Sequence, residues 1–228
     1  MKKILVLTLL TSLVFSAQAQ KRYVANGFGW RAQYAPHDFT EFTDVLGSEQ
    51  IRNLNRAQWQ YGFFWKLHID NTFTEVNFGF NWANNQNDSL EWRMSSNSTQ
   101  VRFGWLPLNT PRIMLNPHLG VNLDHFNTIV SPREKKVPLD DYVNSPGQEM
   151  EFYQFRAYAG LQTAFRLSDK EGRERWLTLV GGYQLPIHGS PLVYSTGNRL
   201  TTNRQIRSSG LVLEARLLFL RRPGSEDK

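Results

Sequence analysis

The 228-residue sequence contains no cysteine. Disulfide bonds, thiolate-bound metal sites and a lipid anchor on an N-terminal cysteine are therefore excluded. Beyond residue 20, no window approaches eighteen consecutive apolar residues, which is about the length that a membrane-spanning helix requires. If this chain crosses a membrane, it must cross as β-strands.

Motifs for catalysis or metal binding are also missing. The five histidines share no H-x-x-x-H or H-E-x-x-H spacing, so no zinc site is predicted. There is no G-x-S-x-G nucleophile elbow and no phosphate-binding loop. We expect no catalytic, cofactor-binding or metal-binding residues, and we expect His68 and His118 to take part in hydrogen-bond networks.

Charge of one sign is not concentrated anywhere in the chain. Lysine and arginine number 26 and acidic residues 20, which gives a formal net charge of +6. Removal of Lys2 and Lys3 with an N-terminal leader lowers this charge to +4. In an exported chain with scattered basic residues, this mild excess does not predict nucleic-acid binding.

The N-terminus has the order of a secretory signal peptide. Two lysines precede an apolar run from Ile4 to Phe15, and the small residues Ala17 and Ala19 follow. This pattern predicts a signal peptide over residues 1–19 that is cleaved after Ala19. The remaining 209 residues suit one domain.

Alternation of apolar and polar residues dominates the rest of the chain. In AQWQYGFFWKLHI, residues 57–69, every odd-numbered residue is apolar and every even-numbered residue except Phe64 is polar or glycine. This period of two predicts a β-strand. Eight such segments recur, over residues 23–34, 57–69, 72–83, 90–105, 112–125, 151–167, 176–187 and 210–220. A helical turn is predicted only within 39–54.

The fourth segment departs from simple alternation. Its apolar residues change parity between Met94 and Val101. We therefore predict a β-bulge or an early strand end at this point.

The connections between the eight segments alternate in length. Those at residues 70–71, 109–111 and 168–175 are short, whereas three others run to about twenty residues rich in Asn, Ser, Pro and charge. In an up-and-down sheet, all the short turns lie at one end and the long loops at the other. Transmembrane β-barrels have this layout.

Glycine and charged residues occupy the polar parity of the segments. At least one glycine lies there in every segment, and only Gly181 breaks the pattern. Glycine weakens a strand, but it relieves crowding in the lumen of an eight-stranded barrel. We therefore place the polar parity inside, with Glu75 facing Lys66 or Arg102. The predicted lumen network comprises Lys66, Glu75, Arg102, Arg156, Arg166, Glu214 and Arg216.

Large aromatic residues lie on the apolar parity near strand ends, as in the interfacial girdles of membrane barrels. The alternative is that these rings form the core of a soluble sandwich or lipocalin-like barrel. We predict that they contact the lipid interface, four at the long-loop end and two at the short-turn end. They are Tyr34, Trp59, Trp82 and Tyr153, then Trp105 and Phe219.

The chain resembles the small eight-stranded outer-membrane barrels of Gram-negative bacteria, the OmpA-membrane-domain and OmpX kind of the porin-like family. The resemblance rests on the leader, the eight segments and phrases such as NPHLGVNLDHF, AYAGLQTAF and LVGGYQLPI. It implies an all-β, antiparallel, up-and-down transmembrane barrel over 20–220 and a short periplasmic tail over 221–228. It further implies insertion by the barrel-assembly machinery, with Phe219 as the C-terminal aromatic residue, although LRRPGSEDK follows it.

These features favour a monomeric, non-enzymatic outer-membrane protein whose long extracellular loops contact an unidentified protein partner. Basic loop residues are candidates for contacts with lipopolysaccharide phosphates or the partner. They are Arg133, Lys135, Lys136, Arg199, Arg204 and Arg207.

Two other functions remain open. One is a narrow channel or carrier for small apolar solutes. The other is a lipid A-modifying barrel enzyme, because His125-Phe126-Asn127 resembles the deacylase pattern of His and Ser two residues apart. Asn127 takes the serine position, however, and has no hydroxyl group to activate.

Overall fold

The computed structural model describes residues 24–36, 57–86, 90–132, 148–170, 172–189, 193–194 and 209–221. The predicted signal peptide, the helical turn within 39–54 and the tail beyond residue 221 lie outside these ranges. Within them, no helix is long and apolar enough to cross a bilayer.

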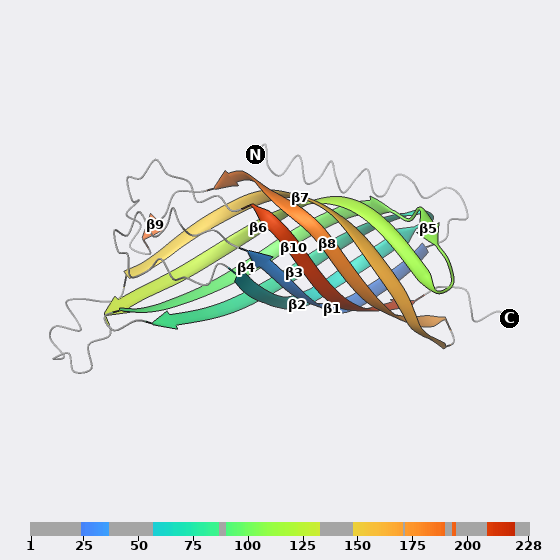
Figure 1. The fold of residues 1–228 in the computed structure, drawn as a ribbon, viewed down its shortest axis with the longest axis horizontal. Coiled ribbons are helices and arrows are strands. Elements are labelled where there is room, and N and C mark those ends of the chain that lie inside the picture. The colour runs from blue at the N-terminus through green and yellow to red at the C-terminus, as the bar shows by residue number, and fades with distance from the viewer. Residues whose placement is uncertain are drawn as a thin grey trace.

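Eight long strands make up most of the described chain (Figure 1). They are β1 (Val24–Pro36), β2 (Ala57–Ile69), β3 (Thr72–Gln86), β4 (Leu90–Trp105), β6 (Ile113–Pro132), β7 (Gln148–Lys170), β8 (Arg173–Gly189) and β10 (Gly210–Arg221). Two-residue strands add to the sheet: β5 (Leu108–Asn109) pairs with β6, and β9 (Val193–Tyr194) pairs with β7. The eight predicted segments are therefore confirmed as strands, with shifted ends.

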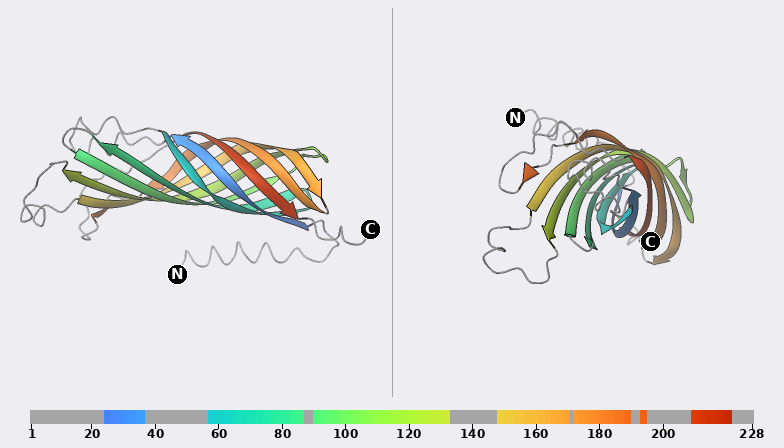
Figure 2. Two further views of the ribbon diagram at one scale, coloured as in Figure 1. Left: turned by 90° about the horizontal axis from the view of Figure 1, so that it is seen from below. Right: turned by 60° about the vertical axis from the view of Figure 1, so that its left-hand side comes forward.

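Each long strand pairs antiparallel with the next, and the sheet closes on itself. β1 pairs with β2 on one side and with β10 on the other, where Trp30 lies opposite Leu217. The strands wind around the closed sheet at a steep tilt (Figure 2), as closure of an eight-stranded barrel requires. The predicted fold class, an eight-stranded antiparallel up-and-down barrel, is confirmed.

Apolar side chains cover the outside of the barrel and polar side chains fill it. Trp59, Phe63, Phe78 and Leu213 point outward, with between 37% and 54% of each residue exposed. The interior positions between them carry Gln60, Lys66 and other polar residues that are almost fully buried. This inside-out arrangement contradicts the soluble-barrel alternative, in which the aromatic face would form a dry core.

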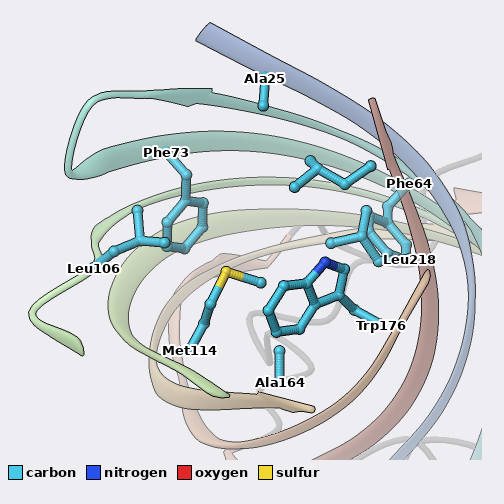
Figure 3. Packing of buried hydrophobic residues seen from close by; sticks show 9 residues of the cluster. Ala25, Phe64, Phe73, Leu106, Met114, Ala164, Trp176 and Leu218 are labelled. Atoms are coloured by element: carbon cyan, nitrogen blue, oxygen red, sulfur yellow. The ribbon is translucent and has the colours of Figure 1, made fainter. Parts of the chain in front are cut away.

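The interior is apolar at the short-turn end. Phe73, Leu106, Met114 and Trp176 converge there with smaller side chains from neighbouring strands (Figure 3). The full cluster, named the apolar plug below, is Ala25, Phe64, Phe73, Leu106, Met114, Ala164, Trp176, Leu218 and Leu220. All nine residues are at most 3% exposed, so the lumen is densely packed at this end.

The barrel is taller on one flank than on the other. β6 and β7 have 20 and 23 residues, whereas β1, β2 and β10 have only 12 or 13 (Figure 1). Pairing between β6 and β7 continues to Val130 opposite Gln148, well past the ends predicted at residues 125 and 151. The long-loop ends of three strands form what we call the strand extension. It consists of β4 before Asn97, β6 after Leu123 and β7 before Tyr153.

Polarity reverses in the strand extension. Asn127, Glu149 and Glu151 are on its outer face, while Phe126 and Phe152 are buried on its inner face with ring centroids 4.6 Å apart. In a barrel that spans a bilayer, such a reversal is expected where the sheet extends beyond the lipid and its outer face meets water.

The bulge or early strand end predicted in the fourth segment is wrong. β4 pairs with β3 without a shift from Trp105 to Glu91, and with β6 from Gly104 to Leu90. Met94 is on the interior parity and 4% exposed, in step with Arg102. The parity change in the sequence marks the reversal of polarity at the extension, not a break in the strand.

Candidate functional site

A cluster of six charged side chains occupies the middle of the lumen. We call it the lumen hub, and it consists of Arg31, Lys66, Glu75, Arg102, Glu214 and Arg216. Each of these side chains is at most 1% exposed. They come from β1, β2, β3, β4 and β10, so the hub joins five of the eight strands.

Glu75 is one of the two carboxylates at the centre of the hub. Its Oε1 atom accepts a hydrogen bond of 2.6 Å from Arg216 Nη1 and lies 3.8 Å from Arg102 Nη1. Its Oε2 atom lies 3.8 Å from Lys66 Nζ. Lys66, Glu75 and Arg102 are direct neighbours across β2, β3 and β4, so strand register positions these three charges.

Glu214 is the second carboxylate. It accepts a 2.7 Å hydrogen bond from Arg216 Nε and further bonds from the Nη2 atoms of Arg216 and Arg102. Arg31 Nη1 lies 4.0 Å from Glu214 Oε1. Hydrogen bonds to charged groups are the stronger kind, and a buried carboxylate needs such partners to offset its loss of hydration.

The hub holds four cations against two carboxylates, and uncharged partners take up further donors. Arg31 donates to Gln33 at 2.6 Å, and its other nitrogen donates to Ser98 at 3.1 Å. Lys66 donates to Gln162 at 3.1 Å and lies 3.9 Å from the centre of the Phe73 ring. Such contacts with ring faces and uncharged oxygens add to the longer ion pairs that these two cations form with Glu214 and Glu75.

The predicted lumen network is only partly one cluster. Lys66, Glu75, Arg102, Glu214 and Arg216 come together, but Arg156 instead forms a separate buried pair with Asp124. Arg166 lies at the short-turn rim, where it bonds to Asp169 at 2.6 Å and to Glu174 at 3.4 Å. It is therefore not a member of the hub.

Sequence reasoning missed Arg31 and the role of Asp124. Both occupy the polar parity of their strands, so parity alone could have included them. Arg31 is 4% exposed and Asp124 is fully buried.

A side chain added at a lumen glycine would collide with neighbouring atoms. A Cβ atom on Gly62 would lie 1.9 Å from the Phe78 carbonyl oxygen, and one on Gly182 would lie 2.3 Å from Tyr158 Oη. An added Cβ on Gly181, the one glycine of opposite parity, meets nothing within 4 Å. The crowding that the glycine pattern predicts is present in the structure.

The six predicted interface aromatics lie on the outer surface. At the long-loop end, Tyr34 and Trp59 pack edge-to-face with ring centroids 5.4 Å apart, and Trp82 packs on Phe80 at 5.3 Å. Trp82 is the most exposed of the large apolar residues in the described ranges, at 70%. Tyr153 lies beside β6 at the same end, and Trp105 and Phe219 lie at the short-turn end.

The residues of the deacylase-like pattern, His125 and Asn127, contact neighbouring side chains on β7. His125 stacks on Tyr153 at 4.5 Å, and its Nε2 atom lies 3.7 Å from Glu151 Oε2. Asn127, at the serine position, donates a 2.7 Å hydrogen bond to Glu149. A histidine and a carboxylate are therefore present without a nucleophile at the patterned position.

Across the described ranges, no group of three or more histidine and acidic residues is arranged to hold a metal ion. The six basic loop residues, Arg133, Lys135, Lys136, Arg199, Arg204 and Arg207, lie outside the described residues.

Comparisons with known proteins give structural matches only. No family model matches the sequence, and no curated protein does. Solved structures similar to this chain include a major outer membrane protein from Thermus thermophilus, with 12% identity and a TM-score of 0.47 over 86% of this chain and 98% of that one. Neisserial surface protein A matches with 7% identity and a TM-score of 0.41 over 88% and 96% of the two chains.

The attachment invasion locus protein Ail of Yersinia pestis is also similar, with 10% identity and a TM-score of 0.39 over 89% of this chain and 99% of that one. The first of the three is named as an outer-membrane protein and the second as a surface protein. With TM-scores below 0.5, the fold assignment rests on the strand pairing of this chain itself.

Proposed function

We propose that this protein is a non-enzymatic outer-membrane barrel with a closed lumen, acting as a surface-exposed structural or interaction protein. The observation that carries the proposal is the filled interior. The lumen hub cross-links five strands at mid-height, and the apolar plug fills the short-turn end. A lumen packed with its own side chains gives the barrel rigidity, and it leaves the exposed end as the part available to partners.

The outer surface supports a membrane location. On β6, the outward residues Leu115, Leu119, Val121 and Leu123 form an apolar run that ends at His125 and Asn127. An apolar band of this kind matches the hydrocarbon core of a bilayer. The strand extension then carries polar groups beyond the lipid, where the long loops begin.

The orientation and partners follow from the same proposal. The short turns and the tail face the periplasm, and the long loops face the exterior. Phe219 serves as the aromatic residue for the barrel-assembly machinery. The basic residues of the loops contact lipopolysaccharide phosphates, and the loops bind a protein partner.

Conductance in planar bilayers tests the closed lumen. The full chain is refolded and inserted, and current is recorded under a steady voltage. We expect no steady conductance above the empty bilayer, because the hub and the plug leave no continuous water path. A reproducible ohmic conductance would overturn the closed-lumen proposal in favour of the channel alternative.

Two further measurements address the partner and the chemistry. Cell-surface capture with the intact protein is compared with capture by a variant that lacks residues 133–147, which leaves the β6–β7 pairing intact. Loss of the captured partner is expected if this loop binds it.

Mass spectrometry of lipid A from cells with and without the protein should show no change, and a shortened acyl pattern would instead favour the deacylase.

A further inference from the structure

Basic side chains gather on one flank of the barrel at its short-turn end. All five are exposed, and they lie on β7, β8 and β10 and just before β6: Arg112, Lys170, Arg173, Arg175 and Arg221. On the opposite flank, the described residues at 69–74 and 103–111 include no basic side chain and one acidic side chain, Asp70. Among the described residues, the exposed basic side chains at this rim therefore lie on one flank, which also carries the acidic Asp169.

Strand register places these cations side by side. Arg173 lies opposite Arg221 on β10 and opposite Lys170 on β7. Arg175 lies opposite Phe219 and Ser168, where the apolar band ends. Each cation therefore lies at the boundary between the apolar band and the water beyond it.

A groove of about 470 Å³ opens on the same flank, between the start of β6 and the end of β7. It forms where the pairing of β7 with β8 shifts register between Arg166 and Ser168, and where Arg112 O accepts a 2.9 Å hydrogen bond from Arg166 N. Its apolar lining is Ile113, Phe165 and Leu167, which belong to the outer apolar surface.

The groove combines this apolar wall with two cations, Arg112 and Arg166, and one carboxylate, Asp169. Arg166 is already engaged by Asp169 and Glu174. Arg112, by contrast, is exposed and forms no ion pair with another described residue. A ligand with an apolar chain and a negative head matches the two parts of the groove.

We propose that this flank binds a phospholipid with an anionic headgroup from the periplasmic leaflet. Its acyl chain lies on Ile113, Phe165 and Leu167, and its phosphate is held by Arg112 with Arg175 nearby on β8. Basic groups at a membrane surface attract anionic lipid in this way. The assignment of the leaflet rests on the proposed outer-membrane orientation, whereas the binding itself does not.

A lipid fits better than a soluble phosphate or a protein. The apolar wall is continuous with the band that contacts acyl chains, so a lipid already in the bilayer reaches the groove without leaving its own layer. A soluble phosphate would leave that wall uncovered. Proteins are not the expected occupants because the groove is at the level of the lipid headgroups.

Native mass spectrometry of the full chain in detergent tests the proposal. The protein is mixed with phosphatidylglycerol, with phosphatidylethanolamine, or with inorganic phosphate, and bound adducts are counted. We expect a phosphatidylglycerol adduct in excess of the phosphatidylethanolamine adduct, and no retained phosphate. Arg112→Gln should weaken phosphatidylglycerol binding about fivefold, and Arg112→Gln with Arg175→Gln more than that.

Arg93→Gln is the matched control, because Arg93 is an exposed arginine at the opposite end of the barrel. It should leave the preference unchanged, and far-UV circular dichroism checks that every variant is folded. Equal adducts with both lipids, unchanged binding in Arg112→Gln, or the same loss in Arg93→Gln would each overturn the proposal. Retained phosphate would show an anion site in place of a lipid site. The lipid-binding experiment uses purified protein and does not depend on where the protein is in the cell. If cell fractionation found the protein outside the outer membrane, that result would contradict the proposed function but not the lipid binding.

Discussion

Glu75 and Glu214 are the two carboxylates of the lumen hub. Each is buried among cations from strands far apart in the sequence. A buried ion pair is not in itself strong evidence of stability, because desolvation of both partners opposes their attraction. Removing one partner is different, since it leaves the other charge buried without compensation.

Replacement of Glu214 by Gln should therefore be costly. Glu214→Gln keeps the size of the side chain but leaves Arg31, Arg102 and Arg216 with Glu75 as the remaining hub carboxylate. We expect a loss of about 3–5 kcal/mol in the free energy of unfolding. Urea unfolding in lipid vesicles, followed by tryptophan fluorescence, measures it.

Glu91→Gln is the control for this experiment. Glu91 pairs with Arg93 at 2.9 Å, but its side chain is 34% exposed and that of Arg93 is 63% exposed. Exposed pairs contribute about 0–1 kcal/mol. Equal losses in the two variants would show that the hub is no more important than a surface pair.

Gly181 and Gly182 allow a test of lumen crowding at adjacent positions. Gly182→Ala places its Cβ 2.3 Å from Tyr158 Oη and 2.8 Å from the Ala159 carbonyl oxygen, whereas Gly181→Ala meets open space. We expect Gly182→Ala to destabilise by about 1–3 kcal/mol and Gly181→Ala to be neutral or slightly stabilising. The same urea unfolding assay measures both, and a larger loss at Gly181 would contradict the crowding argument.

Parity predicted which residues lie inside, but not how they pair. The period of two correctly placed Lys66, Glu75 and Arg102 on neighbouring strands, because register relates strands that follow each other in the chain. The shortest contact of Glu75 is instead with Arg216, 141 residues away on the other side of the lumen. No local pattern encodes a contact across the lumen, so it could not be predicted from one sequence.

At the scale of the strand, β6 passes through two environments. Its outward face is apolar up to Leu123 and then carries His125 and Asn127, followed by the apolar Ile129. The transition explains why the predicted strand ended seven residues early, at 125 in place of 132: once the outside faces water and the inside is apolar, the alternation changes sign. The false bulge in β4 has the same cause. A single periodicity cannot describe a strand whose apolar face changes from the outside to the inside of the barrel.

Arginine substitutions along β6 locate the edge of the bilayer. Leu119→Arg puts a charge in the middle of the apolar run and should cost about 2–4 kcal/mol, while Asn127→Arg on the same outward face should cost about 0–1 kcal/mol. Unfolding of both variants in vesicles measures the difference. A comparable cost at both positions would mean that the strand extension lies within the lipid.

At the scale of the whole molecule, the two ends of the barrel differ. The short-turn end has an apolar interior and a one-sided basic rim, and the other end extends into a sheet with a polar outer face. This asymmetry gives the proposed orientation a physical basis, with the taller end outside the cell.

The absence of cysteine makes the orientation easy to test. Asn84 is exposed at the long-loop end of β3, and Asn71 is exposed in the turn between β2 and β3. The two test variants are Asn84→Cys and Asn71→Cys. A membrane-impermeant maleimide added to intact cells should label the first variant and not the second. Both should react once the outer membrane is permeabilised. Labelling of Asn71→Cys alone in intact cells would show the reverse insertion.

The origin of the hub residues bears on the order of assembly. Arg31, Lys66 and Arg102 belong to the first half of the chain, where Glu75 is the one hub carboxylate, and Glu214 arrives only with the final strand. Without that strand, the hub has three cations and one anion, Glu75. β10 adds one anion and one cation, Glu214 and Arg216, so the net charge of the hub does not change. It does bring a carboxylate acceptor for Arg102 and the nearest cation to Glu75, so the hub is completed only when the last strand pairs with β1 and closes the barrel.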